Sequence, residues 1–218
     1  MNTLFSDDDR ARIAEAIDAA EAKTSGEIVP YVAVRSAPYA AVPWRAGVLG
    51  ALLMLALLVL ARAVLLGLPA FLTADITALA LMLGAGGFSA YVAASVPALI
   101  RRFAGADRMD AAVHQRALQA FVEEDVFATR DRTGILLFVS LLEHRIEVVA
   151  DAGIYRAVDA AEWRGVTARI RTGIEDGVLA QGLIDGIEQC GAILREHGLR
   201  PSPDDADELS GRIRFDGA

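Results

Sequence analysis

Three aspartates are the residues of this chain whose type and spacing point most directly to chemistry. Asp131, Asp151 and Asp159 fall in successive loops that flank two apolar segments, 135–142 and 145–150. Carboxylate oxygens are the ligands that Ca²⁺ and Mg²⁺ prefer. If these side chains converge, the sequence predicts a divalent-metal site that could polarise a phosphoryl oxygen and position a water molecule for hydrolysis.

Each aspartate also has a purely structural interpretation. Asp131 could stabilise a turn, Asp151 could end a strand and Asp159 could cap a helix. The sequence holds no Gly-x-Ser-x-Gly, Walker or dinucleotide-binding motif. The histidines form no pair at metal-ligand spacing: they are His114, His144 and His197. Both interpretations of the aspartates stay open at this point.

The segments around these loops alternate between helical and strand patterns. Ser6 with Asp9 predicts the start of a first helix, and Pro30 predicts an edge strand or a bulge. Segments 135–142 and 145–150 predict an antiparallel hairpin. The remaining expected elements are a strand at 27–35 and helices at 110–127, 159–174 and 179–197. The predicted fold class is α/β, a small mixed sheet sandwiched by helices.

Two long apolar runs interrupt this pattern, at Ala46–Leu72 and Ile76–Ile100. About 20 helical residues cross a hydrocarbon core of ~30 Å, so both runs are long enough. Arg62 in the first run costs roughly 2.5–3.5 kcal/mol, and the leucines around it offset this at roughly 0.3–0.6 kcal/mol each. We expect a transmembrane helical hairpin; the alternative is a buried helix pair inside a soluble domain.

Arginines flank the hairpin, whereas the short linker carries only Asp75. They are Arg35 and Arg45 before it and Arg101, Arg102 and Arg108 after it. The positive-inside rule then predicts a multi-pass membrane protein with both termini in the cytoplasm. The single Cys190 fits a reducing compartment.

The expected domains are a discontinuous cytoplasmic domain over 1–42 and 103–200, the hairpin over 43–102, and a flexible tail over 201–218. The net charge of −8 disfavours nucleic acid as a partner. The expected partners are therefore the lipid bilayer and a protein at the membrane.

Four segments resemble the TPM-domain family, which is named after thylakoid lumen, photosystem repair and acetylcholine-receptor regulator proteins. They are Thr24–Val29, Asp131–Val139, Arg145–Ile154 and Gly177–Ile187. The hairpin resembles the membrane-inserted bacterial branch of that family, and this resemblance implies a location in the bacterial inner (cytoplasmic) membrane. The resemblance implies an α/β sandwich, and family members include acid phosphatases, divalent-metal binders and accessory factors for membrane complexes.

The resemblance extends to two of the aspartates. Asp131 resembles the family's acidic residue before the glycine of the second strand, and Asp159 resembles the acid that opens the next helix. The chain departs from the family at Asp131–Gly134, where many members have Asp-Asn-Gly, and at Ala150–Gly153. The expected function is an accessory or scaffold factor for a membrane-associated partner. The alternative is a divalent-metal-dependent phosphatase of the TPM type, using Ca²⁺ or Mg²⁺.

Overall fold

The computed structural model describes residues 4–66, 76–201, 209 and 211–216. The chain divides into two compact units. The α/β unit comprises Met1–Ala37 and Asp110–Ala218, and the hairpin unit comprises Pro38–Met109. The expected linker Thr73–Asp75 and most of the expected tail lie outside the described residues.

The α/β unit is built on a four-stranded mixed sheet in the order β3-β2-β1-β4. Strands β1 (Glu27–Ala33) and β2 (Gly134–Ser140) run parallel, with Glu27 opposite Gly134. Strand β3 (Arg145–Ala150) runs antiparallel to β2, which confirms the predicted hairpin. The mixed α/β fold class is therefore confirmed.

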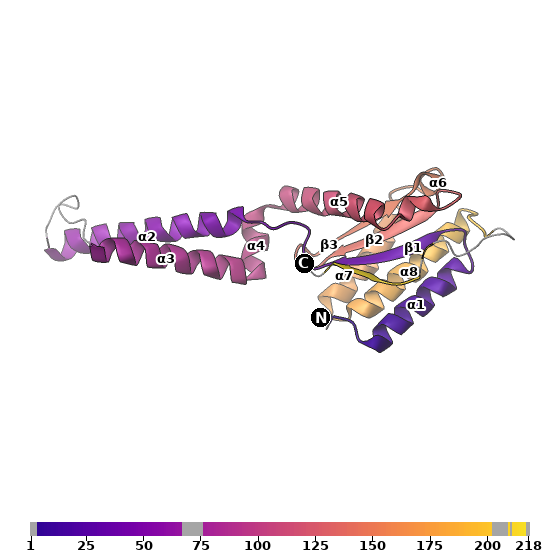
Figure 1. Ribbon diagram of the computed structural model, residues 1–218, viewed down its shortest axis with the longest axis horizontal. Coiled ribbons are helices and arrows are strands. Elements are labelled where there is room, and N and C mark those ends of the chain that lie inside the picture. Colours follow the sequence, from indigo (N-terminus) through magenta and orange to yellow (C-terminus); the bar gives the residue numbers. More distant parts are fainter. Residues whose placement is uncertain (1–3, 67–75, 202–208, 210, 217–218) are drawn as a thin grey trace. The chain divides into compact units, whose positions relative to one another are not determined.

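Helices cover both faces of this sheet (Figure 1). Helices α1 (Asp7–Glu21), α7 (Trp163–Glu175) and α8 (Leu179–Glu196) share one apolar core with the sheet. Helix α5 (Ala106–Glu123) packs on the other face. Successive side chains of a strand point to opposite faces, so a strand covered on both sides must be apolar throughout. All seven residues of β1 are buried, as its continuous apolar sequence predicts.

Local sequence signals account for several helix boundaries. The expected N-cap is present: the Asp9 N–H donates to Ser6 Oγ at 3.1 Å, and the Ser6 N–H donates to Asp9 Oδ2 at 3.0 Å. Helix α7 begins at Trp163, later than the expected 159, because residues before it form a turn in which the Ala161 N–H donates to Asp159 Oδ1 at 3.0 Å. Asp159 therefore shapes the turn that precedes the helix.

The prediction of a flexible tail over 201–218 is wrong for residues 214–216, because they form strand β4 (Arg214–Asp216). This strand lies parallel to β1, with Tyr31 opposite Arg214, and the Val34 N–H donates to the Asp216 carbonyl at 3.1 Å. The short strand leaves no periodic signal in a region rich in polar residues, so the sequence could not show it. Pro30 lies one residue before the β1–β4 pairing begins, where its missing N–H breaks no described β1–β4 bond.

The hairpin unit contains helices α2 (Ala41–Leu66), α3 (Ile76–Ser95) and α4 (Pro97–Ala104). The second apolar run was expected to be one helix to Ile100, but it divides at Val96, which has extended backbone angles. Pro97 causes the division, because a proline disfavours helical geometry in the residue before it and lacks an N–H.

Candidate functional site

Helices α2 and α3 are long and apolar enough to cross a membrane by length and composition. The candidate spans Ala41–Val64 and Ile76–Ser95 have mean hydropathies of 2.4 and 1.7. Core helices of soluble proteins are mostly buried, whereas 0% and 11% of these spans are buried. Two such helices alone are weak evidence for a membrane, but their exposure argues against the alternative of a buried helix pair.

Glycines allow the two helices to approach closely. A Cβ added to Gly50 of α2 would clash with Ser89 of α3, and one added to Gly86 of α3 would lie 3.0 Å from the Gly47 carbonyl oxygen. Small residues at such positions let transmembrane helices gain van der Waals contact that lipid cannot supply. Gly86 therefore takes part in the close packing of α3 against α2.

The predicted aspartates lie at or beyond the end of the sheet where β1 and β2 begin and β3 ends. Buried polar residues gather there: Thr24, Glu27, Thr129, Thr133 and Asp151. The Glu27 N–H donates to the Thr133 carbonyl at 3.2 Å, and the Asp151 N–H donates to the Gly134 carbonyl at 2.9 Å. These bonds hold the loops of three strands together.

Asp151 is the only buried one of the three aspartates, with 5% of its surface exposed. Its Oδ1 accepts the Ala152 N–H at 2.6 Å, which caps the short helix α6 (Ala152–Tyr155). Its Oδ2 lies 2.7 Å from Arg132 Nε, close enough for an ion pair, although that contact lacks hydrogen-bond alignment. Arg132 therefore neutralises the charge that a metal would need.

Asp131 contributes to the same loop through its backbone. A Cβ added to Gly153 would lie 2.5 Å from the Asp131 carbonyl oxygen and 2.6 Å from that of Arg132. The Gly153 N–H also donates to the Arg132 carbonyl at 2.9 Å, and Arg132 has a left-handed φ of 58°. Gly153 of α6 is thus required for the close contact between α6 and the loop before β2.

These contacts favour the structural interpretation of the three aspartates. Within the described ranges, which include all three, no group of three His, Cys, Asp or Glu side chains is placed to hold one metal ion. The structure therefore does not assemble Asp131, Asp151 and Asp159 into one ligand set. Binding of Ca²⁺ or Mg²⁺ by fewer of them stays a prediction.

A second polar cluster, which the sequence did not reveal, fastens β4 to α5. The Arg116 guanidinium lies 2.6 Å from Asp216 Oδ2 and 3.0 Å from Glu123 Oε2, and it donates to the Tyr31 hydroxyl at 2.5 Å. Burial alone would lower the pKa of Arg116, but its hydrogen bond to Asp216 and the nearby charges raise it. Burial raises the pKa of Tyr31, and Arg116 opposes that rise. This network of charged side chains therefore joins α5 to strands β1 and β4 at the edge of the sheet.

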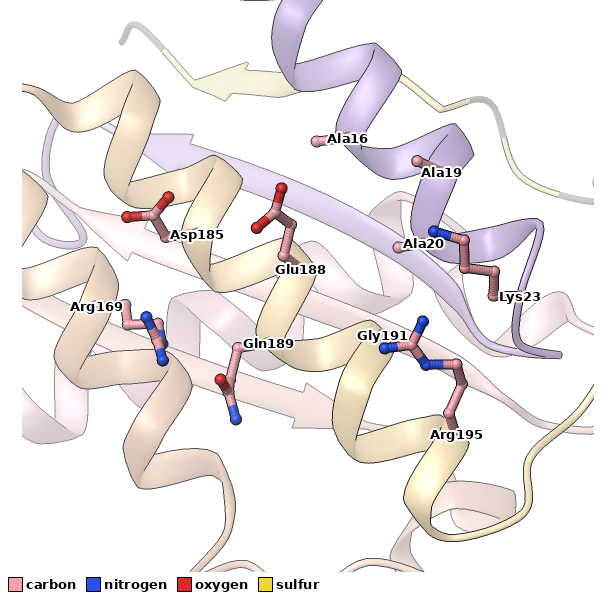
Figure 2. A pocket seen from close by; sticks show the side chains of 10 residues that line it. All are labelled: Ala16, Ala19, Ala20, Lys23, Arg169, Asp185, Glu188, Gln189, Gly191 and Arg195. Atoms are coloured by element: carbon pink, nitrogen blue, oxygen red, sulfur yellow. The ribbon is translucent and has the colours of Figure 1, made fainter.

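The outer surface of α1, α7 and α8 carries a hollow of about 390 Å³ (Figure 2). Small residues of α1 form part of its lining, and α8 contributes Asp185, Glu188 and Arg195. In Figure 2 the Glu188 carboxylate points toward α1, whereas the Gln189 amide points toward α7. The three α8 residues recur at helical spacing, so this stripe could have been found from the sequence.

Several charges around the hollow lack an ion pair with any described residue. They are Lys23, Arg169, Glu188 and Arg195. Unpaired charges of both signs around a shallow depression can complement a charged protein surface, and they steer association more than they add affinity. We refer to this site, defined by the residues of Figure 2, as the charged hollow.

Comparisons with known proteins identify the fold but no family. No family model matches the chain, and no curated protein matches it. The NMR structure of the BA42 protein from the psychrophilic bacterium Bizionia argentinensis is similar, with a TM-score of 0.57 and 20% sequence identity. The match covers 97% of this chain and 94% of that one. At this identity the similarity supports the fold alone.

Proposed function

We propose that this chain is an integral membrane protein that holds a protein partner at the bacterial inner membrane. The hairpin of α2 and α3 would anchor it, and the α/β unit would dock the partner in the cytoplasm. The observation that carries this proposal is the pair of long apolar helices whose surfaces are exposed rather than buried. A partner-docking role fits the unpaired charges of the charged hollow.

The arginine distribution supports the orientation. Arg45 precedes the first span and Arg101, Arg102 and Arg108 follow the second, whereas Asp75 is the only charge between residues 63 and 100. Segments rich in arginine are retained on the cytoplasmic side. Both termini would therefore be cytoplasmic, with residues 67–75 on the other side.

The phosphatase alternative has less support. Arg132 forms an ion pair with the buried Asp151 carboxylate. The described residues also contain no group of three His, Cys, Asp or Glu side chains that could hold a metal ion. The TPM-like scaffold role needs neither a metal nor a nucleophile, so we place it first.

Topology reporters test the proposal directly. Alkaline phosphatase is active only outside the cytoplasm, whereas green fluorescent protein fluoresces well only inside. We expect fluorescence from a fusion at the C-terminus and phosphatase activity from an insertion after Asp75. The opposite pattern, or full-length protein in the supernatant of a detergent-free lysate after ultracentrifugation, would refute it.

Photo-crosslinking tests the docking role. A photoreactive residue at Glu188 should capture a protein in the membrane fraction, whereas the same residue at Glu175, an exposed position on α7 outside the charged hollow, should not. Equal capture at both positions would refute docking at the charged hollow.

A further inference from the structure

The arginines of the hairpin unit gather near the polar end of the two spans. Arg45 lies in the first turns of α2, and Arg101 and Arg102 lie in the last turn of α4. Helix α4 contacts both α2 and α3, so these arginines belong to one end of the hairpin (Figure 1). Arg45 and Arg102 are exposed and Arg101 is half-buried.

Helix α4 has the residue pattern of a helix that lies in a membrane surface. It begins at Pro97, directly after the break that ends the second span. It combines Arg101 and Arg102 with Ile100 and with Phe103, which is 53% exposed. A helix that joins basic and large apolar side chains lies at the boundary of headgroups and acyl chains. Trp44, 76% exposed, precedes Arg45 on α2 and is the residue type enriched at that boundary.

The charge of this unit is opposite to that of the whole protein. Residues 38–109 contain five arginines and two aspartates, whereas the whole chain carries a net charge of −8. Basic side chains at the end of a membrane span are attracted to the negatively charged phospholipid headgroups around it.

We propose that Arg45, Arg101 and Arg102, together with the apolar side chains of α4, form a binding surface for anionic phospholipid. The arginines contact the phosphate-bearing headgroup, and Phe103 and Trp44 contact the upper acyl chains. This inference depends on the proposed membrane location, since it assigns the lipid class that the hairpin prefers.

Lipid retention tests the inference on the full-length protein. The protein is reconstituted in bilayers of equal parts phosphatidylglycerol and phosphatidylcholine with the same acyl chains. After gentle release into detergent, the retained lipids are counted by native mass spectrometry. We expect more phosphatidylglycerol than phosphatidylcholine on the wild type, and a weaker preference at high salt because the attraction is electrostatic.

Charge variants identify the surface. Each arginine near an anionic surface multiplies the binding constant about fivefold, so replacing Arg45, Arg101 and Arg102 by Gln should reduce the preference about 100-fold. Replacing all three by Lys keeps the charge and should keep the preference within a few-fold. The matched control replaces Arg156, Arg164 and Arg171 by Gln, which are exposed residues of the α/β unit outside the charged hollow, and it should leave the lipid preference unchanged.

The outcomes separate the two proposals. Equal retention of both lipids by the wild type, or an undiminished preference in the triple Gln variant, would overturn the lipid surface. A wild-type protein that never enters the bilayer would instead overturn the membrane location. If the Gln variant does not insert, the wild-type and Lys measurements still decide the lipid preference.

Discussion

The contact between α7 and α8 depends on two glycines, so a single methyl group at that contact should destabilise the α/β unit. A Cβ added to Gly173 would lie 2.5 Å from the Gly182 Cα and 2.9 Å from the Gly182 nitrogen. Both obstructing atoms are backbone, so no side chain can rotate away. Gly173→Ala can be accommodated only if the helices separate.

The magnitude follows from two opposing effects. Forcing an extra methyl group into a close-packed contact costs up to about 3 kcal/mol. Replacing Gly by Ala inside a helix raises the free energy of unfolding by about 1 kcal/mol through helix propensity. The net loss is therefore about 2 kcal/mol, which lowers the melting temperature of a unit of this size by roughly 4–8 °C.

The assay uses tryptophan fluorescence. The chain has two tryptophans, and Trp163 at the start of α7 is 6% exposed. In a Trp44→Phe background, thermal unfolding of the full-length protein in detergent then reports on α7 alone. The control is Gly165→Ala on the same helix, where the nearest described atom to the added methyl group is Gln189 Nε2 at 4.0 Å.

Gly165→Ala should raise the midpoint, because it gains helix propensity without a clash. A Gly173→Ala protein as stable as the wild type would refute the reasoning. So would equal shifts of the same sign in both variants, since helix propensity alone would then explain them.

Three further predictions follow from charged and buried groups. The Ser6 hydrogen bonds lower the pKa of Asp9 in the folded protein. The Asp9 carboxylate therefore stabilises the fold above the pKa that it has in the unfolded chain, and this stabilisation is lost as the pH falls through the folded-state pKa. Asp9→Asn should accordingly lower the urea midpoint at pH ~7 but not at strongly acidic pH. Arg116→Gln removes a charged hydrogen bond to Asp216 worth about 2 kcal/mol, and hydrogen exchange at the Val34 amide should accelerate roughly 30-fold. Burial raises the pKa of the Cys190 thiol, so alkylation should require unfolding of the protein.

Each of these has a control or a contradicting result. Asp8→Asn removes an exposed charge from the same helix turn without a capping bond, so its effect should not match that of Asp9→Asn. Arg171→Gln, on an exposed position of α7, should leave hydrogen exchange at the Val34 amide unchanged. Labelling of Cys190 in the folded protein at the rate seen in denaturant would contradict its burial.

Much of the fold could be predicted from local patterns. The two apolar runs predict long helices because an unbroken apolar segment of this length is stable only in lipid or in a protein core. In either place a helix satisfies the backbone hydrogen bonds within the segment itself. The Ser6–Asp9 cap follows from residues three positions apart. Gly182 and Gly186 lie one helical turn apart on α8, and both lie against α7, at Gly173 and Ile170.

The candidate site could be predicted only in part. The aspartates were correctly placed in loops around paired strands, but nothing in the spacing indicates that Arg132 reaches Asp151 from 19 positions away. The charged hollow combines residues of α1, α7 and α8. Its α8 stripe is visible in the sequence, but its α1 neighbours are not.

The sequence by itself determined the two apolar helices, strands β1 and β2, which are buried on both faces, and the Ser6–Asp9 cap, because each arises from the periodic or adjacent residues of one segment. Only the tertiary structure decided that β4 joins the sheet and that Arg116 bonds Asp216 across 100 positions. It also decided that a buried carboxylate is neutralised by an arginine. Such contacts involve single residues brought together by folding, so they leave no repeat or spacing along the chain.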